Sequence, residues 1–329
     1  MKLRRFLDAL AANSNPMNNL ATQAYSGVLP EHIKMYGDQI QLYSGKVRDM
    51  LRKGEHLYMV HSDRLSAFDR AIGVVPCKGI ILCQMSRFWM EQASQHMPTH
   101  FIEGISDRIL SLRPMKPIKI EVVVRGYLAG SMQRAYLQGD RSFCGQSLPE
   151  NLPSYGRLPK LMITPTTKAD VFQHDENTSE EEIFRSGLVT ESEWRTIVTM
   201  ATDLFNLGTE LYRSRGWILA DTKYEFGRDA KGNISLIDEI HTPDSSRLWD
   251  ADSYDDRIAK GEPPVMLDKE NVRRYLLDQG FSGHGEVPHV PTKQLIGLAL
   301  TYLNVCERLL GNQLELRGEP GLVDLTFLA

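Results

Sequence analysis

The pattern of apolar and polar residues predicts three short strands between Gln39 and Ser62, in the segment QIQLYSGKVRDMLRKGEHLYMVHS. Turns at Gly45 and Gly54 separate the strands, since glycine marks turns between alternating segments. A more strongly apolar strand, IKIEVVV, is predicted at residues 118–124, between a proline and a glycine. These strands predict a first lobe that is rich in antiparallel sheet and ends near the apolar strand.

Apolar residues at helical spacing predict a helix from about Leu82 to Met97. A longer helix is predicted to begin at the capping box Thr190–Glu193 and to end at Gly216, with an apolar stripe that belongs to the core. Two further helices are predicted near residues 269–278 and 292–310, the second ended by a glycine.

The segment from Gly139 to Glu182 is polar and rich in proline, glycine, serine, threonine and aspartate, which predicts a long excursion on the surface. Long ordered loops of this kind are often functional. The expected domain organisation is a leader at residues 1–38, an N-terminal lobe at 39–120 and a C-terminal lobe at 121–329.

The composition narrows the classes of function. A length of 329 residues corresponds to about two domains of roughly 150 residues each. The net charge of -4 supplies no basic field, so nucleic-acid binding has no electrostatic support. The four cysteines form neither CxxC pairs nor a zinc-site spacing, which favours reduced thiols in a cytoplasmic protein. No apolar run approaches the ~20 residues of a membrane span, and Asp8 interrupts the short apolar stretch near the N-terminus, so neither a membrane span nor a signal peptide is expected.

The stretch at residues 220–247, ADTKYEFGRDAKGNISLIDEIHTPDSSR, carries the strongest chemical signal and is predicted to fold as a hairpin. Its first strand places three charged side chains on one face, because they alternate with uncharged ones: Asp221, Lys223 and Glu225. A symmetric register returns Asp238 close to Lys223 and diagonal to Glu225. Two carboxylates beside a lysine, followed by a turn that ends in Arg247, are typical of a site for a hard cation that carries phosphates.

Two other segments also carry candidate chemistry. The loop Ser44–Arg48 offers backbone N–H groups and two cations to a polyphosphate, although it is not a Walker A sequence and, taken alone, is most typical of an ordinary turn. The apolar strand that ends at Arg125 delivers an arginine to its tip. Ser131 then opens a short predicted helix, where it serves as an N-cap, as part of a phosphate site, or as both.

Seven segments follow one another over roughly residues 40–280: YSGKVRD (43–49), SDRLSAFD (62–69), EVVVRGYLAGS (121–131), TPTTKAD with HDE (164–176), ADTKYEFG (220–227), DEIHTPDSSRLW (238–249) and LDKENVRRYL (267–276). Together they resemble the SAICAR synthetase family, in which they are expected in this order. The resemblance implies an α+β fold of two lobes. The N-terminal lobe is an antiparallel sheet that covers the nucleotide, the C-terminal lobe is larger and α/β, and ATP lies in the cleft between them.

The resemblance also implies an activity in de novo purine biosynthesis. It is that of an ATP-dependent carbon–nitrogen ligase, which joins L-aspartate to the carboxylate of CAIR (carboxyaminoimidazole ribonucleotide) and forms SAICAR, ADP and phosphate. An acyl phosphate of CAIR is the expected intermediate, and Mg²⁺ is expected beside ATP. The sequence does not determine the oligomeric state, and a homo-oligomer is compatible with it.

The resemblance and the motif chemistry together assign the site residues. The catalytic group is expected to be Lys223, Glu225 and Asp238, with Glu225 and Asp238 as the magnesium ligands. The ATP-binding residues are expected to be Ser44, Gly45, Lys46, Val47 and Arg48 at the phosphates, with the backbone near Glu121 and Val123 at the adenine. The substrate-binding residues are expected to be Ser66, Asp69, Arg125, Ser131, Asp244, Arg247, Lys269 and Arg273.

Some motifs and functions keep a second interpretation. His241 lies near two carboxylates, but its direction along the strand differs from theirs, so a packed structural histidine is expected instead of a general base. His174 and Asp175 are expected in turn chemistry or, by the resemblance, near aspartate. A small-molecule kinase would form a stable phosphorylated product without L-aspartate. A non-catalytic nucleotide-binding module would tolerate the loss of Glu225.

Overall fold

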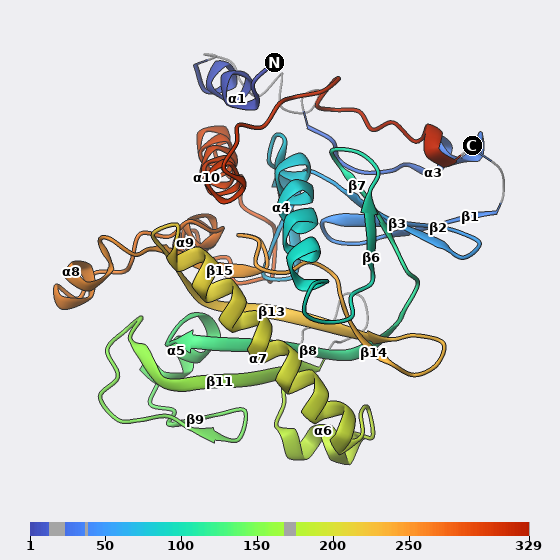
Figure 1. The fold of residues 1–329 in the computed structure, drawn as a ribbon. Helices are drawn as coiled ribbons and strands as arrows, with labels where there is room; N and C mark the ends of the chain where they lie inside the picture. The colour runs from blue at the N-terminus through green and yellow to red at the C-terminus, as the bar shows by residue number, and fades with distance from the viewer. Residues whose placement is uncertain (13–23, 37–38, 168–175, 329) are drawn as a thin grey trace. The chain divides into compact units, whose positions relative to one another are not determined.

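The computed structural model describes residues 1–12, 24–36, 39–167 and 176–328 (Figure 1). Two compact units make up the chain. Residues 1–91, 101–114 and 269–329 form the first unit, and residues 92–100 and 115–268 form the second. The mixture of helices with antiparallel sheets confirms the expected α+β class.

The first unit contains a five-stranded antiparallel sheet in the order β1-β2-β3-β7-β6. Its strands are β1 (Ile40–Ser44), β2 (Arg48–Lys53), β3 (His56–His61), β6 (Phe101–Gly104) and β7 (Ile109–Leu112), and a separate hairpin pairs β4 (Arg64–Ala67) with β5 (Arg70–Val74). Its helical elements are α1 (Leu3–Ala12), α3 (Pro30–Lys34), most of α4 (Lys78–Ala93), α9 (Glu270–Asp278), α10 (Thr292–Leu310) and the 3₁₀ turn η1 (Thr326–Leu328).

The core of the first unit joins both ends of the chain to its sheet. Side chains from the leader, from β1, β2, β3 and β7 and from the C-terminal segment pack in one apolar cluster: Tyr25, Val28, Ile33, Ile40, Leu51, Val60, Ile109, Leu325 and Leu328. Burial of such side chains stabilises the folded state by roughly 1.5–3 kcal/mol each. The leader therefore contributes to the fold of this unit.

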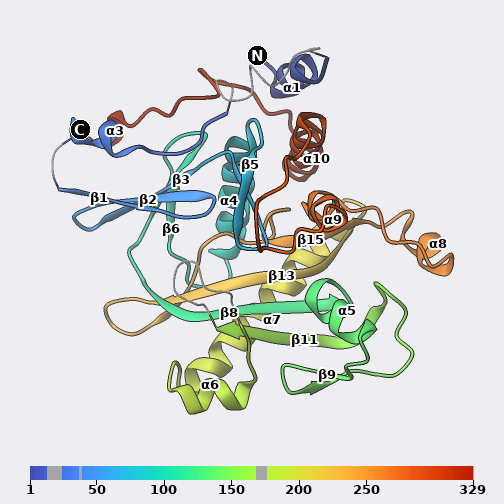
Figure 2. The same ribbon diagram turned by 180° about the vertical axis from the view of Figure 1, so that it is seen from behind.

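The second unit contains a six-stranded antiparallel sheet in the order β12-β11-β8-β13-β14, with β15 also paired to β13. Its strands are β8 (Lys116–Tyr127), β11 (Arg157–Thr167), β12 (Glu176–Asn177), β13 (Trp217–Arg228), β14 (Ile234–Ile237) and β15 (Ser246–Asp250), beside the small hairpin β9 (Ser142–Phe143) and β10 (Gln146–Ser147). Its helices are α5 (Gly130–Leu137), α6 (Glu180–Ser186), α7 (Glu191–Arg213) and α8 (Tyr254–Ala259). Figure 2 shows β8 between β11 and β13.

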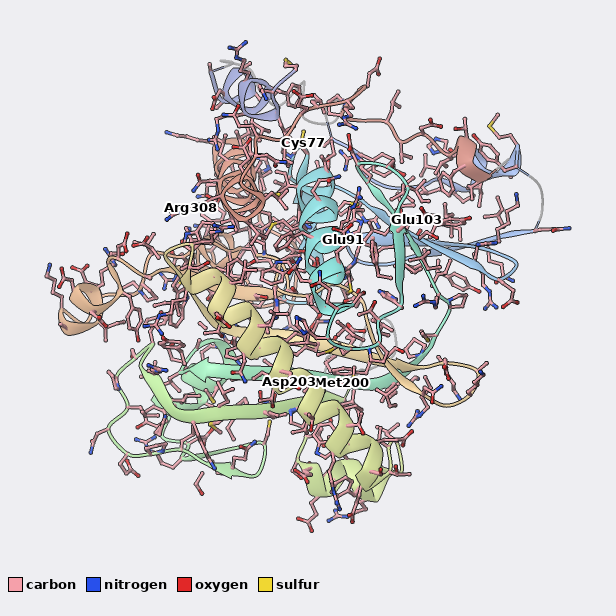
Figure 3. The ribbon with its side chains drawn as sticks, viewed as in Figure 1. Cys77, Glu91, Glu103, Met200, Asp203 and Arg308 are labelled. Carbon is pink, nitrogen blue, oxygen red and sulfur yellow. The ribbon has the colours of Figure 1, made fainter. Side chains whose placement is uncertain are left out.

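The period of two along β8 and β13 gives this sheet two different faces. One face is apolar and fully buried, with Val122 and Val124 on β8 and Tyr224 and Phe226 on β13. Helix α7 covers this face (Figures 1 and 2), and Phe205 on it packs 3.4 Å from the position of a Cβ at Gly126. Figure 3 places Met200 and Asp203 on the same helix, where Met200 is buried and Asp203 is exposed. The opposite face carries the charged residues.

Most predicted elements are confirmed, with shifted ends. The three strands β1 to β3 and the helices α7, α9 and α10 lie where the pattern predicts them, and the side chain of Thr190 accepts from the N–H of Glu193 as a capping box requires. Helix α4 begins and ends about four residues before the predicted helix. Among the described helices, none combines the length and apolar character needed to cross a bilayer.

The predicted surface excursion at residues 139–182 was wrong in part, because it contains the long strand β11. Two prolines argued against a strand, since proline cannot donate to a sheet ladder. Pro159 lies where the register between β11 and β8 shifts, and Pro165 lies where only β8 and the two residues of β12 flank the strand. Both are positions where a strand tolerates proline.

Candidate functional site

Three carboxylates surround the amine of Lys223 on the polar face of the second unit's sheet. The Lys223 Nζ lies 3.0 Å from Glu121 Oε1 and 3.6 Å from Asp238 Oδ2, and it donates a short hydrogen bond to Glu225. The predicted return of Asp238 to Lys223 is therefore confirmed. Asp238 comes directly after β14, and its φ of 64° turns the chain there.

Glu121 is the member of this group whose side chain the sequence analysis missed. Glu121 on β8 lies directly opposite Glu225 on β13, and two like charges in this position repel each other unless a cation separates them. Lys223 is that cation. The backbone near Glu121 and Val123, which was expected to receive adenine, pairs with β11 on one side and with β13 on the other. Neighbouring strands therefore occupy both edges of β8 at these residues, whereas the side chain of Glu121 forms an ion pair with Lys223.

The carboxylates also determine the charge of Lys223. Burial alone would lower the pKa of this amine, but the combined attraction of Glu225, Glu121 and Asp238 outweighs burial and raises its pKa well above the ordinary value. Lys223 is therefore a cation throughout the physiological range. The group as a whole, with three carboxylates and one ammonium, carries excess negative charge that favours a further cation.

A second charged cluster on the same face consists of two arginines that share one carboxylate. Arg125 Nη1 lies 2.7 Å from Asp221 Oδ2, and Arg247 Nη1 lies 2.9 Å from the same oxygen. Asp221 is directly opposite both arginines in the sheet register, and Thr164 accepts from Arg125 Nε at 2.9 Å. Two guanidinium groups and one carboxylate leave a net positive charge, which suits an anionic ligand.

The start of α5 contacts this cluster. Ser131 Oγ accepts from Arg125 Nη2 at 3.4 Å, and the guanidinium of Arg247 lies 2.5–2.7 Å from the position of a Cβ at Gly130. The prediction that Ser131 begins the helix was off by two residues, because Ala129 is the N-cap and its side chain makes no capping hydrogen bond. Asp244 is half-buried in the turn between Thr242 and Ser246, where its N–H donates to Thr242 Oγ1 at 3.3 Å.

In the first unit, the loop between β1 and β2 carries the remaining predicted phosphate contacts. Gly45 N donates to Arg48 O at 2.8 Å, and a Cβ at Gly45 would lie 2.8 Å from that oxygen, so the tight turn requires glycine. Val47 O accepts from Ser62 Oγ at 2.6 Å. The amine of Lys46 lies 2.5 Å from Asp69 Oδ1, so the structure brings together one predicted ATP contact and one predicted substrate contact.

The other predicted substrate contacts of the first unit lie on β4 and at the start of α9. Ser66 lies on β4 opposite Ala71, before the turn in which Phe68 and Asp69 adopt φ values of 50° and 60°. A positive φ strains the backbone of residues other than glycine, and such strain is often found at functional sites. Lys269 is the buried N-cap of α9, and Arg273 forms a 3.3 Å ion pair with Glu270.

Comparison with known proteins identifies the family. Residues 41–289 match the family model described as SAICAR synthetase. The phosphoribosylaminoimidazole-succinocarboxamide synthase of Flavobacterium psychrophilum is 40% identical over 282 residues, which are 84% of this chain and 89% of the relative. The chain belongs to the SAICAR synthetase family. It is therefore an ATP-dependent ligase of purine biosynthesis.

Solved SAICAR synthetases share its fold. The SAICAR synthase of Saccharomyces cerevisiae in complex with SAICAR superimposes with a TM-score of 0.73 at 30% identity and covers 85% of this chain and 97% of its own. A SAICAR synthetase in complex with ADP gives a TM-score of 0.65 at 26% identity, over 84% of this chain and 100% of its own. Both pairs match over nearly the whole of the solved chain.

The two histidine segments with a second interpretation can now be compared with the structure of this member of the SAICAR synthetase family. His174 and Asp175 lie outside the described residues. His241 is completely buried, as expected of a structural histidine, and its Nε2 lies 2.6 Å from the hydroxyl of Tyr224. Its ring packs against α7, where a Cβ at Gly208 would lie 2.6 Å from His241 Cε1.

Burial lowers the pKa of His241 to about 3, which predicts a loss of stability in acid. The unfolded histidine has a pKa of about 6.5, so between these values the unfolded chain binds a proton that the folded chain does not. The free energy of unfolding therefore falls as the pH falls through this window, by up to about 1.4 kcal/mol per pH unit from this residue. Urea denaturation at pH values from 7 to 4 measures this dependence. The free energy of unfolding should fall less steeply with falling pH in His241→Gln than in the unaltered protein. Equal dependence in both would contradict the lowered pKa of His241.

Proposed function

We propose that this chain condenses CAIR with L-aspartate and forms SAICAR, ADP and phosphate through an acyl phosphate. The observation that carries the proposal is the polar face of β8 and β13 in a member of this family, where a carboxylate–lysine group and a two-arginine cluster lie on neighbouring positions. The relative solved with SAICAR and the relative solved with ADP support the same chemistry.

In the first proposed step, a carboxylate oxygen of CAIR attacks the γ-phosphorus of ATP, and the bond to the bridging oxygen of ADP breaks. In the second, the amine of L-aspartate attacks the acyl carbon, the C–O bond to phosphate breaks and the amine loses a proton. Both steps bring anions together, so the protein acts mainly by positioning and by electrostatic stabilisation.

The residues of the loop between β1 and β2 are proposed to hold the ATP phosphates. Lys46 and Arg48 supply positive charge, and the backbone of Lys46 and Val47 is proposed to supply N–H donors. Lys223 is proposed to hold phosphate oxygens, because its ammonium remains charged.

The donor set around Lys223 fits a magnesium ion. No group of three or more His, Cys, Asp or Glu side chains in metal-binding geometry occurs among the described residues. Mg²⁺ does not require one, since it usually takes one or two carboxylates together with substrate phosphates. Glu225 and Asp238 are proposed to hold the ion, with Glu121 nearby, because their oxygens already converge on a cation. When bound, the ion would neutralise charge on the phosphates.

The two-arginine cluster is proposed to hold CAIR. Arg125 and Arg247 would bind its anionic groups, with Asp221 fixing both guanidinium groups in the sheet. Ser131 and Asp244 are proposed as further CAIR contacts, and Ser66, Asp69, Lys269 and Arg273 as contacts to the remaining substrate groups. The enzyme is proposed to act in the cytoplasm, consistent with the four cysteines being free thiols.

Release of ADP measured with each substrate present or omitted tests the reaction. We expect release only when CAIR and L-aspartate are both present with ATP and Mg²⁺, and we expect SAICAR to form in equal amount. Release of ADP at the full rate without L-aspartate, with a stable phosphorylated product, would instead indicate a small-molecule kinase.

A further inference from the structure

The guanidinium of Arg64 links the loop between β1 and β2 to the leader. On the loop side, Arg64 Nη2 donates to Gly45 O at 3.1 Å and Arg64 Nε donates to Lys46 O at 3.3 Å. On the leader side, Arg64 Nη1 donates to Ser26 O at 2.5 Å. One planar side chain therefore binds three backbone carbonyls from two segments far apart in the sequence.

Asp49 completes this arrangement as the buried anion that holds Arg64. Arg64 Nη2 lies 2.7 Å from Asp49 Oδ1, and the N–H of Val28 donates to Asp49 Oδ2 at 2.8 Å. The carboxylate of Asp49 is fully buried, and only a fifth of the Arg64 side chain is exposed. A buried bidentate pair of this kind holds its groups in one geometry.

Gly27 leaves the space that the pair occupies. Its φ of 135° lies in the range that favours glycine, and a Cβ there would lie 2.0 Å from Arg64 Nη1 and 2.6 Å from Asp49 Oδ2. The leader thus passes directly over the pair, and any larger residue at position 27 would displace it.

We propose that Arg64, held by Asp49 and the leader, is a positioning residue that fixes the loop Ser44–Arg48 in its ATP-binding conformation. The inference rests on the proposed function of this loop as the phosphate site. Arg64 binds the carbonyls of Gly45 and Lys46, so it holds the two peptide groups that follow these carbonyls in one orientation. Without Arg64, only a fraction of molecules holds the loop in that conformation, and the apparent affinity for ATP falls by that fraction.

Two variants remove the link in different ways. Arg64→Lys retains the charge but loses the planar fork, and Gly27→Ala retains every charge but forces the fork aside. Arg228→Lys is a matched control, because Arg228 also binds a carboxylate, Glu193, and a backbone carbonyl, that of Leu188, and its side chain is 24% exposed against 20% for Arg64. None of these contacts of Arg228 involves the loop.

Calorimetric titration with MgATP, without the other substrates, measures the effect directly. We expect the Kd for MgATP to rise about tenfold in Arg64→Lys and in Gly27→Ala and to stay unchanged in Arg228→Lys. In the steady state, the KM for ATP should rise by a similar factor, whereas kcat and the KM values for CAIR and L-aspartate should change less than about twofold. Thermal unfolding of each variant identifies any that fails to fold. If Arg64→Lys or Gly27→Ala does not fold, the MgATP affinity of the other variant tests the proposal.

A double-mutant cycle with Lys46→Ala separates this inference from the proposed function. If Arg64 acts through the loop, Arg64→Lys should add little to the loss of MgATP affinity already caused by Lys46→Ala. Additive losses, or unchanged affinity in both link variants, would overturn the positioning role while leaving the phosphate loop intact. Unchanged affinity in Lys46→Ala alone would overturn the phosphate assignment of the loop and the inference with it.

Discussion

Replacing Glu225 with glutamine is expected to lower kcat about a thousandfold, the loss typical of removing one preorganised charged group from a reaction centre. The proposed site needs the negative charge of Glu225 for Mg²⁺, and the amide supplies an oxygen of similar shape without that charge. Lys223 keeps two carboxylate partners, Glu121 and Asp238, so the folded protein should persist. Steady-state turnover and circular dichroism of the variant check both parts.

The magnesium dependence gives this prediction its sharper form. Asp238→Asn should likewise lose activity, and both variants should require more Mg²⁺ for half-maximal turnover. Glu150→Gln is a suitable control, because Glu150 forms an exposed ion pair with Arg141 in the same unit. Turnover close to that of the unaltered enzyme at saturating Mg²⁺ would contradict the metal assignment.

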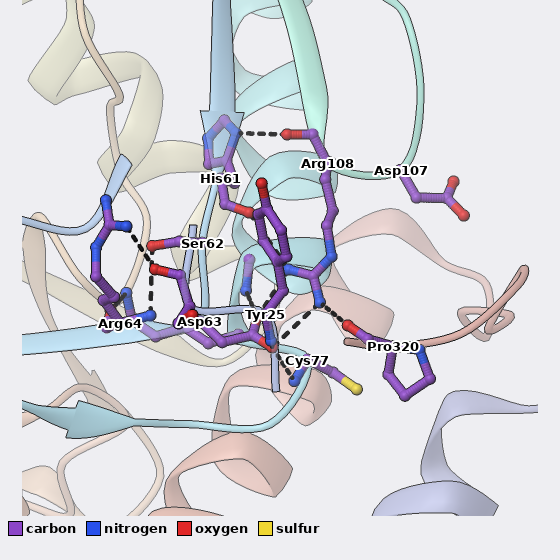
Figure 4. Close-up of polar contacts among 12 residues, drawn as sticks. Tyr25, His61, Ser62, Asp63, Arg64, Cys77, Asp107, Arg108 and Pro320 are labelled. Atoms are coloured by element: carbon purple, nitrogen blue, oxygen red, sulfur yellow. Dashed lines mark hydrogen bonds and ion pairs between the residues drawn. The ribbon is translucent and has the colours of Figure 1, made fainter. Parts of the chain in front are cut away.

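Replacing Arg108 with methionine is expected to lower the free energy of unfolding by about 3–5 kcal/mol, because it leaves a buried carboxylate without its partner. Arg108 and Asp63 form a buried bidentate pair with distances of 2.8 and 3.1 Å (Figure 4). Asp63 also accepts from the backbone N–H groups of Tyr25, Cys77 and Gly79. Arg108 itself donates to Pro320 O at 2.8 Å, so the pair joins five segments of the unit.

Urea denaturation followed by tryptophan fluorescence measures this loss. Arg87→Met is the matched control, because Arg87 forms a half-exposed helical ion pair with Glu91 and its removal should change stability by less than about 0.5 kcal/mol. A loss below about 1 kcal/mol in Arg108→Met would show that the pair is not a main support of the unit.

The charged face of β13 was predictable from the sequence because strand alternation depends on local order alone. Asp221, Lys223 and Glu225 share a face as expected. The register pairs Ile237 with Glu225, so the ladder alone would put Asp238 opposite Tyr224 on the other face. Asp238 leaves the strand geometry with a φ of 64°, and its carboxylate lies within reach of Lys223. The side chain of Glu121 was missed because it lies in an apolar segment, although its spacing of four from Arg125 puts both on one face of β8. That parity was the available signal.

Partners far apart in sequence were not predictable in the same way. Nothing in the order of residues joins Asp63 to Arg108, or Arg64 to the carbonyl of Ser26, because such contacts depend on how the strands and the leader pack. Asp63 stands in the polar motif SDRLSAFD, yet the structure buries it completely. The strand β11 was missed for a related reason. Its prolines are tolerated because one lies at a register shift and the other beside the two-residue strand β12, and neither position can be read from the order of residues.

The interleaved path of the chain has a consequence for the order of folding during synthesis. Residues 115–268 supply nearly all of the second unit without a break, whereas the core of the first unit includes Leu325 and Leu328. A ribosome makes those two residues only after all of residues 115–268. We therefore expect the second unit to gain protease resistance on nascent chains while the first unit, although begun earlier, still lacks part of its apolar core.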